Sequence, residues 1–442
     1  MIFLIIINWF FMKNKKIELL VGVADFKGAI AAVKNGANAV YFGVKGFNMR
    51  DLGTNFEKKE LKKLMRYLHE NNLKGYLALN TIVFPEELKK VDSILLASKK
   101  VGVDAVIASD FGVMLLVKKH KLELHVSTQC SVSNELALKQ FKKIGAKRIV
   151  LARELNFSQV KKMVIFAKKI GLEVEAFVHG AMCIAVSGRC FMSHDIFGRS
   201  ANRGECLQVC RRTFHVDSKQ LEEENCNYNS LKEATAFFLD GSPNSFEKKS
   251  LKISGNTILS AKDMKTIEIL DKVLATRIIS LKIEGRTKPT DYIAITTKCY
   301  RQAIDSIKNN SFSKKKIDFW NKELSKVYNR KFSTGFWEKT PSKKEFTDIE
   351  GSAQTQKRVN VGRITKFYAK INVAEIKLFD KIQIGDSIII EGNTTFLEQE
   401  LSSMQIHHKE LKVAFKGQNV GIKVNERVRV NDLVFKIVKN KK

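Results

Sequence analysis

Residues Glu18–Gly43 read ELLVGVADFKGAIAAVKNGANAVYFG, a pattern that decides the fold of this chain. It predicts a strand over Glu18–Val23, a helix over Phe26–Asn35 and a second strand over Ala39–Gly43. Gly36 follows the predicted helix, as glycine often does because it adopts the left-handed conformation that ends a helix. The order strand, helix, strand is that of a βα unit.

The same alternation continues through the first 290 residues. Further strands are predicted over Gly75–Asn80, Ala105–Ser109, Glu123–Ser127, Arg148–Glu154, Val174–His179 and Ile279–Glu284. Helices are predicted over Glu57–Asn71, Glu86–Lys100, Glu135–Lys143, Ser158–Ile170, Ala261–Leu274 and Thr290–Ile307. Eight strands in βα order predict an α/β fold, a (β/α)8 TIM-like barrel. An open doubly wound sheet is the weaker alternative, because no glycine-rich dinucleotide-binding sequence follows the first strand.

The spacing of the strands suggests how the chain divides. Roughly a hundred residues separate the seventh strand from the eighth, whereas connections of about 2–6 residues are usual. We therefore assign 17–310 to the barrel, with a long Cys-bearing insertion after strand 7 at 180–258, and 311–357 to a basic linker. The remaining 358–442 alternate short β-branched runs with turn residues, which predicts a small C-terminal all-β barrel domain.

Residues 1–16 form an N-terminal extension with an apolar start, MIFLIIINWFF. This run is shorter than the ~20 residues that cross a bilayer, and its lysines follow it, unlike those of a signal peptide. A mis-assigned start, with Met12 as the true one, and a short membrane-anchoring segment are the two interpretations. The rest of the sequence contains no hydrophobic span, so we expect no stable membrane span and a cytoplasmic location.

Composition narrows the class of protein. Of 442 residues, 44% are hydrophobic, which excludes wholesale disorder. The formal net charge of +31 favours a polyanionic partner such as RNA, DNA or an anionic membrane face. A lysine-rich composition that decorates a solvated surface explains the charge about as well, so charge alone does not identify RNA binding.

Five of the seven cysteines lie in the insertion, and four of them are close together in sequence: Cys183, Cys190, Cys206 and Cys210. Ligands that are all thiolates suit Zn²⁺ or an Fe–S cluster. Their C-x6-C, C-x15-C and C-x3-C spacings match neither a zinc ribbon nor the ferredoxin pattern, so both metals stay open. Small buried cysteines without a metal are the weaker alternative.

Polar residues stand at the ends of several predicted strands, where TIM-like barrels place their catalytic groups. The candidates are His125, Arg153, Glu154, His179, Lys282, Glu284 and Arg286. Together they predict one polar pocket at the barrel mouth. Core histidines and an ion pair of Glu284 with Arg286 are the structural alternatives. His179 lies near Cys183 in sequence, but no recognised protease signature accompanies the pair.

At these residues the sequence resembles peptidase family U32. The resemblance rests first on EAFVHGAMCIAVSGRCFMS (Glu175–Ser193) and NRGECLQVCR (Asn202–Arg211). Shorter matches are HVSTQ (His125–Gln129), LARE (Leu151–Glu154), LSAKDM (Leu259–Met264), SLKIEGR (Ser280–Arg286) and YRQAID (Tyr300–Asp305). The resemblance to the family extends over nearly the whole chain from Glu18. The C-terminal domain resembles the small translation-factor-like β-barrel of such proteins.

The resemblance implies a choice of activities. The family carries a collagenase-like peptidase label, while other members resemble [4Fe-4S] proteins that hydroxylate without O2, with prephenate as hydroxyl source. Their substrates are a tRNA wobble uridine, which becomes 5-hydroxyuridine, an rRNA cytidine, or a ubiquinone precursor. Cys183, Cys190 and Cys206 fall on cluster-ligand positions. Many relatives place a further cysteine where this chain has Lys265, so Cys210 is the first candidate for the fourth ligand and Cys226 the second.

We therefore expect an Fe–S-dependent RNA hydroxylase that acts on tRNA, with rRNA as the second substrate class. Arg153, Lys282 and Arg286 are expected to hold a small dicarboxylate co-substrate, because guanidinium groups bind carboxylates bidentately. His125, His179, Glu154 and Glu284 are the candidate acid/base groups. A U32 peptidase and a non-catalytic RNA-binding protein are the alternatives.

Overall fold

The computed structural model describes residues 17–212 and 259–440, and eight parallel strands of this part close into a barrel. Each strand pairs with the next one in the chain, and the last pairs with both the first and the seventh, which completes the ring. The barrel strands are β1 (Glu18–Gly22), β2 (Ala39–Gly43), β3 (Lys74–Leu79), β4 (Ala105–Ala108), β5 (Leu124–Val126), β6 (Ala146–Val150), β7 (Glu173–Gly180) and β9 (Ser280–Ile283). The predicted TIM-like barrel is confirmed.

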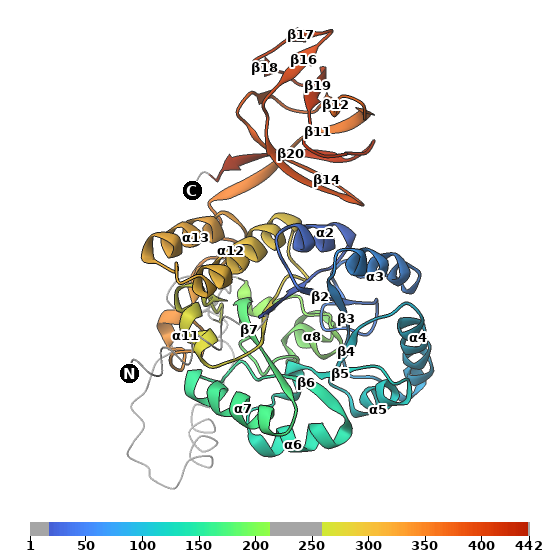
Figure 1. Cartoon of the computed structure of the whole chain (residues 1–442), viewed down its shortest axis with the longest axis vertical. Helices are drawn as coiled ribbons and strands as arrows, with labels where there is room; N and C mark the ends of the chain where they lie inside the picture. The colour runs from blue at the N-terminus through green and yellow to red at the C-terminus, as the bar shows by residue number, and fades with distance from the viewer. Residues whose placement is uncertain (1–16, 213–258, 441–442) are drawn as a thin grey trace, which may run out of the picture.

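Helices surround this ring (Figure 1). Several begin at an Asp or Asn whose side chain accepts a hydrogen bond from the first turn, as Asp25 and Asn134 do. The helices are α2 (Phe26–Lys34), α3 (Leu61–Glu70), α4 (Leu88–Lys100), α5 (Phe111–Lys119), α6 (Glu135–Ile144), α7 (Phe157–Lys169), α11 (Leu270–Ala275) and α12 (Thr290–Lys308). The main hydrophobic core lies between the strands and these helices.

The helix predicted over Ala261–Leu274 is wrong in its first half. That half contains a short strand, β8 (Asp263–Lys265), and a 3-10 turn, Ile267–Ile269, before α11 begins. β8 pairs antiparallel with the end of β7, where His179 faces Lys265. The end of β7 extends beyond its neighbours, and its backbone groups there gain partners from β8.

The segment 311–357, predicted as a basic linker, is folded against the barrel. It contains α13 (Lys314–Lys326), which packs on α12, and β10 (Phe332–Ser333), which pairs with β8. Trp320 and Leu324 of α13 are buried, since residues four apart share one face of a helix. Five of the 13 residues of α13 are lysines, and this basic composition suggested a linker.

The C-terminal domain consists of strands, as predicted. Eight of them pair in the order β15-β14-β20-β11-β12-β19-β16-β17, and β13 pairs separately with β18. Within the described residues no pairing joins β15 to β17, but residues of β13, β15, β16 and β18 enclose one apolar cluster, in agreement with the predicted small all-β domain. The strands are β11 (Gln356–Tyr368), β12 (Val373–Leu378), β13 (Ile382–Gln383), β14 (Ser387–Gly392), β15 (Thr395–Glu400), β16 (Met404–Ile406), β17 (Lys409–Glu410), β18 (Val413–Ala414), β19 (Asn419–Lys423) and β20 (Leu433–Lys439).

This domain sits on the barrel beside α2, α12 and α13 (Figure 1). Ile389 and Phe396 are buried in the same apolar cluster as the barrel helices. Glu391 accepts hydrogen bonds from Lys27 at 2.5 Å and from Arg358 at 2.7 Å, so an ion-pair network also crosses the junction. The two domains therefore share a core.

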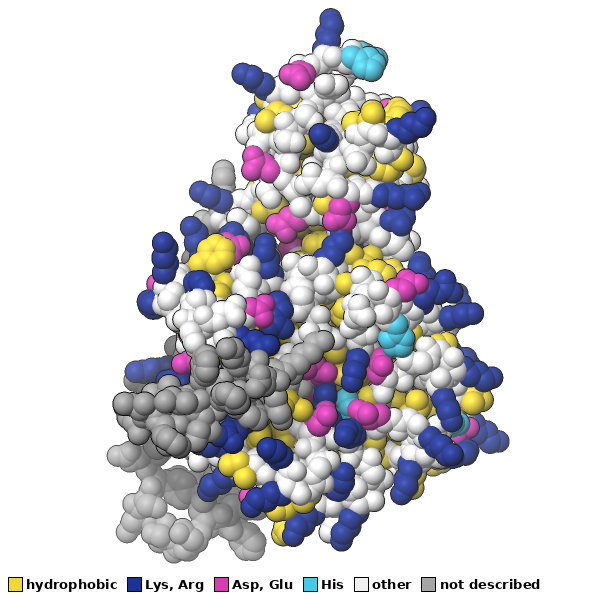
Figure 2. All heavy atoms as spheres, in the orientation of Figure 1, with side chains coloured by type: hydrophobic (Ala, Val, Ile, Leu, Met, Phe, Trp, Pro, Cys, Tyr) yellow, Lys and Arg dark blue, Asp and Glu magenta, His cyan; other side chains and the backbone are white. Residues whose placement is uncertain are grey.

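The surface in Figure 2 carries Lys and Arg side chains around the barrel and on the C-terminal domain, with a small acidic group near the middle of the barrel. On this face the positive charge is spread widely. No helix within the described residues has the length and apolarity that a membrane crossing requires.

Candidate functional site

A pocket at the C-terminal ends of the barrel strands, which we call the mouth pocket, gathers charged side chains. Four residues predicted from the strand ends line it: Arg153, Lys282, Glu284 and Arg286. Further lining side chains come from the strands and from the loops after them: Tyr41, Met49, Arg50, Asn80, Gln129 and Phe177.

The mouth pocket holds more positive than negative charge. Its four cations, Arg50, Arg153, Lys282 and Arg286, surround the single carboxylate Glu284. Arg50 donates to Glu284 from Nε at 2.9 Å, and the nearest Arg153 nitrogen lies 3.8 Å from the same carboxylate. Burial raises the pKa of Glu284, but Arg50 and Arg153 lower it to about 2, so Glu284 is ionised.

Lys282 lies at the inner end of this pocket. Its Nζ donates to Glu175 at 2.8 Å and stands 4.2 Å from the centre of the Tyr41 ring. Four cations against the carboxylates of Glu175 and Glu284 leave an excess of two positive charges. An excess inside a protein is costly unless a ligand anion compensates it.

Several polar atoms of the mouth pocket are buried without a partner. They are Nε of Arg153, Nε of Arg286 and Oε2 of Glu284. Burial lowers the pKa of Arg286 to about 10, although its guanidinium donates to Asn55 at 2.7 Å and to Asn48. A buried donor without a partner costs about 1–3 kcal/mol. Two arginine donors without hydrogen-bond partners and the excess positive charge suit this pocket to an anionic ligand.

His125 lies in the barrel interior, outside the lining of the mouth pocket, which corrects its predicted place. Its Nε2 is 2.9 Å from Glu123, its ring contacts Tyr76 edge-on, and burial lowers its pKa. Arg148 also lies in the interior and donates to Glu175 at 3.2 Å and to Glu173 at 2.8 Å. These side chains fill the barrel beneath Lys282, so the mouth pocket opens only on the side of the strand ends.

His179 and Glu154 are also placed away from the mouth pocket. The pairing of β7 with β9 shifts register between Phe177 and His179, and such a bulge turns the following side chain. His179 contacts Tyr292 and Tyr300 of α12, and burial lowers its pKa to about 3. Glu154 follows a bend after β6 and is exposed. Neither lines the pocket.

Four cysteines of the insertion line a second pocket, which we call the cysteine pocket: Cys183, Cys190, Cys206 and Cys210. It shares Met49, Arg50, Gln129 and Arg153 with the mouth pocket, so the two adjoin. Burial raises the pKa of Cys210, and so would negative charge on the thiols of Cys183, Cys206 and Cys190. Cys226 lies outside the described residues.

A glycine places the insertion against the barrel. Gly204 has φ +94°, and a Cβ there would lie 2.1 Å from the carbonyl oxygen of Asn48. Its own carbonyl accepts the amide of Asp51 at 3.0 Å. The loop that carries Asn48 and Arg50 therefore touches the cysteine-bearing loop directly, which explains how the two pockets come to adjoin.

The donor set of the cysteine pocket is four thiols, the ligands that suit Zn²⁺ or an Fe–S cluster. Tetrahedral Zn²⁺ with bonds of ~2.3 Å needs its sulfurs within about 4 Å of one another. Among the described residues no group of three or more Cys, His, Asp or Glu side chains is arranged to hold one metal ion. Four thiols around one pocket are nevertheless the ligands that an Fe–S cluster uses.

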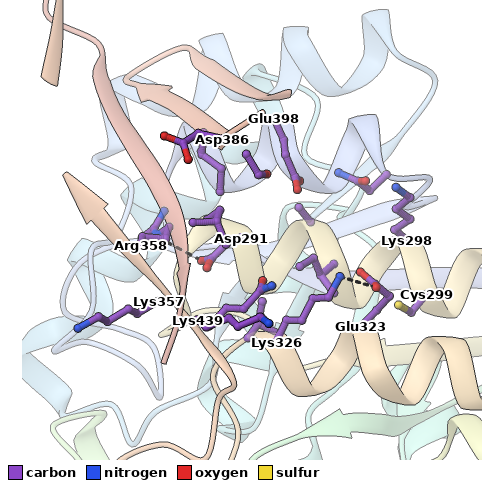
Figure 3. Close-up of a pocket in the computed structure, with 18 of the residues that line it drawn as sticks. Asp291, Lys298, Cys299, Glu323, Lys326, Lys357, Arg358, Asp386, Glu398 and Lys439 are labelled. Atoms are coloured by element: carbon purple, nitrogen blue, oxygen red, sulfur yellow. Dashed lines mark hydrogen bonds and ion pairs between the residues drawn. The ribbon is translucent and has the colours of Figure 1, made fainter. Parts of the chain in front are cut away.

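A larger cavity of about 460 Å³ lies elsewhere, between α12, α13 and the C-terminal domain (Figure 3). Its charges are largely matched, with Lys326 paired to Glu323 at 2.5 Å and Arg358 to Asp291 at 3.7 Å. Burial raises the pKa of the Cys299 thiol to about 12, so this thiol is unreactive. No residue from the end of a barrel strand lines this cavity, so we do not assign it a catalytic role.

A protease dyad is absent from the part of the chain that the structure describes. There, no histidine makes a hydrogen bond to a cysteine thiol or a serine hydroxyl. The hydrogen bonds of the described histidines join His69 to Asp104, His120 to Asp92, His125 to Glu123 and His179 to Tyr300.

Sequence reasoning missed Arg50 and its neighbours Asn48 and Asn55. They lie in the loop after β2, and Arg50 comes seven residues after Gly43. The prediction rested on residues next to the strand ends, and these three lie further along the loop. A usable signal was the run FNMRD (Phe47–Asp51), which places polar residues in the loop after a buried strand.

Comparisons with known proteins agree with the resemblance. The sequence profile of peptidase family U32 matches residues 24–347. A protein of Methanocaldococcus jannaschii named an uncharacterized protease is 42% identical over 95% of this chain and 98% of its own. A collagenase of Porphyromonas gingivalis is 32% identical over 97% and 99%. The tRNA hydroxylation protein P1 of Bacillus subtilis is 32% identical over 75% and 73%.

Proposed function

The chain belongs to peptidase family U32, and from that premise we propose that it is an Fe–S-dependent RNA hydroxylase. The proposed reaction forms 5-hydroxyuridine at the wobble position of tRNA, with prephenate as the hydroxyl source. The single observation that carries the proposal is the adjoining arrangement of a four-thiol pocket and a buried cationic pocket.

The cationic pocket supports a dicarboxylate co-substrate. Prephenate carries two carboxylates, and the mouth pocket has an excess of two positive charges. The unpartnered Nε donors of Arg153 and Arg286 are the groups that would bind carboxylate oxygens. Arg50 and Glu284 hold each other in place beside them.

The cysteine pocket supports the cofactor. Cys183, Cys190, Cys206 and Cys210 are the residues that would hold a [4Fe-4S] cluster. When bound, such a cluster supplies one-electron redox chemistry. Arg50 lines both pockets and places a positive charge beside the residues that would hold the cluster.

In the overall reaction the hydroxyl donor and the uridine exchange groups. The C–OH bond of the donor and the C5–H bond of uridine break, and C5–OH and donor C–H bonds form. The uridine loses two electrons and the donor gains two, so O2 is not required. Lys282, Arg153 and Arg286 keep the donor anion ionised and oriented at the barrel mouth, and the walls of the pocket limit water.

RNA is proposed as substrate on two grounds. The relative in Bacillus subtilis is named for tRNA hydroxylation, and the net charge of +31 suits a polyanion. Phosphate contacts would make binding fall steeply with salt.

Nucleoside mass spectrometry tests this function. The chain is expressed in a host that lacks its own tRNA uridine hydroxylases, and total tRNA and rRNA are digested and compared. We expect 5-hydroxyuridine to return with the wild-type chain and to stay absent with Cys190→Ala. An unchanged profile of hydroxylated pyrimidines would overturn the proposal, and proteolysis by the metal-free protein would favour a peptidase instead.

The co-substrate is tested separately by calorimetry without RNA. Arg286→Gln should weaken prephenate binding by at least tenfold, because a charge-assisted hydrogen bond contributes about 1.5–3 kcal/mol. Arg301→Gln is the matched control, since Arg301 lies on α12 and pairs with Asp305 at 2.6 Å. Equal affinity for both variants would remove Arg286 from the anion site.

A further inference from the structure

Large apolar side chains are exposed around the cysteine pocket. Phe191 follows Cys190 directly and is 72% exposed, and Phe197 is 47% exposed. Phe84, from the loop after β3, is also 47% exposed. We call these three residues the rim aromatics. Exposed large apolar groups that gather beside a site mark a binding surface, whereas scattered ones do not.

Arginines accompany two of the rim aromatics. The guanidinium of Arg203 lies 4.5 Å from the centre of the Phe84 ring, and that of Arg212 lies 5.7 Å from the centre of the Phe197 ring. Arg203 is fixed by Glu87 at 2.5 Å and stands next to Gly204, a lining residue of the cysteine pocket. Among the described residues no arginine lies over the ring of Phe191, which is the most exposed of the three.

We infer that the rim aromatics stack the unpaired bases of a single-stranded RNA loop and hold the target base above the mouth pocket. The inference rests on the proposed function and names the surface that recognises its substrate. Aromatic rings and arginine planes are the groups on which unstacked bases pack, while exposed arginines such as Arg199 and Arg212 bind phosphates.

A single strand fits this surface better than a duplex. Duplex RNA is recognised through its backbone and shallow groove, which needs cations but no exposed aromatic rings. A base that reacts at C5 must leave its stack, and an aromatic platform compensates for the stacking that it loses. The positive charge of the arginines disfavours an apolar protein partner, which would bury them unpaired.

The test measures binding of a tRNA anticodon stem-loop by fluorescence anisotropy at several salt concentrations. Phe191→Ala should raise the Kd by roughly 5- to 150-fold without changing the salt dependence, because stacking is not ionic. Arg212→Gln should reduce the salt slope by about one. The matched control is Phe415→Ala, since Phe415 is also exposed but lies in the C-terminal domain. Iron content and melting temperature of each variant show that the fold is intact.

The outcomes separate the two proposals. If the stem-loop binds and Phe191→Ala binds it equally well, the stacking surface is overturned and the hydroxylase stands. If the same loss appears with a fully paired RNA duplex, recognition of single strands is overturned. If no RNA binds and the nucleoside profile is unchanged, both fail. If no RNA binds but the profile changes, the stacking surface alone is overturned, and a protein partner becomes the candidate for the rim aromatics.

Discussion

Glu175 is the carboxylate that compensates the positive charges of Lys282 and Arg148 inside the barrel. It is fully buried and pairs with Lys282 at 2.8 Å and with Arg148 at 3.2 Å. Burial raises the pKa of Glu175, but Lys282 and Arg148 lower it to about 2. Removing one partner of a buried ion pair leaves the other charges uncompensated, which costs about 3–5 kcal/mol.

Glu175→Gln should therefore lower the free energy of unfolding by about 3–5 kcal/mol in chemical denaturation. Glu173→Gln is the control, because Glu173 binds the same Arg148 at 2.8 Å but is partly exposed, and should cost about 1 kcal/mol or less. The folded pKa lies below the ordinary 4.5, so this stabilisation is present above that pH and is lost as pH falls towards 2. A gap between wild type and Glu175→Gln that stays constant down to pH 2 would contradict the assignment.

At this scale the strand-end rule predicted part of the site. It found Arg153, Lys282, Glu284 and Arg286, because side chains near the C-terminal ends of barrel strands share one pocket. It failed for His179, because a register shift in β7 is not visible in the sequence. The rule does not apply to Arg50, because Arg50 lies seven residues after the end of β2 and its position depends on how the whole loop folds.

The cysteine-bearing loop depends on close backbone contact at Gly204. Its φ of +94° and the 2.1 Å that a Cβ would leave to Asn48 allow no side chain. Gly198 offers a matched position, with φ +63° but open space around its missing Cβ.

Gly204→Ala should therefore displace the loop and lower the bound iron by at least half. The readouts are iron analysis and absorbance near 400 nm after anaerobic purification. Gly198→Ala should keep its iron and lose only about 1 kcal/mol of stability, the usual cost of a left-handed residue with a Cβ. Equal iron in both variants would show that the loop contact is not needed.

The helix α13 makes a second prediction at the level of elements. Trp320 is buried and its indole donates to Gln302 of α12 at 3.0 Å, whereas its neighbour Phe319 is exposed. Trp320→Ala should destabilise the barrel by about 3–5 kcal/mol, and Phe319→Ala by about 0.5 kcal/mol or less. Thermal unfolding measures both, and similar small effects would mean that 311–357 is a linker after all.

The sequence predicted the helices and strands that have a long regular hydrophobic pattern. It missed a very short strand and a helix that carries apolar residues on its exposed face. Each of the eight barrel strands overlaps its predicted range, although β6 ends at Val150 where Glu154 was predicted. Helix α5 was missed because exposed Phe111 and Leu115 interrupt its polar face. Three-residue β8 was missed because its structure depends on pairing with β7, a contact distant in sequence.

At the scale of the whole molecule, the barrel and the C-terminal domain share apolar and ionic contacts, so we expect them to unfold together. Phe396 of β15 and Ile389 of β14 are buried in the apolar cluster of the barrel. Lys27 of α2 and Arg358 of β11 both bind Glu391. Composition predicted where the C-terminal domain begins in the sequence. It contains no information on which side chains of one domain contact the other.

Phe396→Ala should destabilise the whole chain by about 3 kcal/mol or more, since a large buried side chain is removed. Tryptophan fluorescence reports on the barrel, because Trp320 and Trp337 lie there, and far-UV circular dichroism reports on both domains. We expect the two signals to shift together. Two separate transitions, with only the circular dichroism shifted, would show that the domains unfold independently.

The filled interior of the barrel has a consequence for the order in which the two proposed substrates bind. The ion pairs of Glu175 with Arg148 and Lys282 fill the barrel at the inner end of the mouth pocket, and on its other side the pocket adjoins the cysteine pocket. If RNA binds across that side as proposed, it would trap an anion already in the mouth pocket and exclude one that arrives later. The proposed reaction should then follow a compulsory order, in which the small acid binds before the RNA and leaves after it, and excess RNA should inhibit turnover in steady-state kinetics.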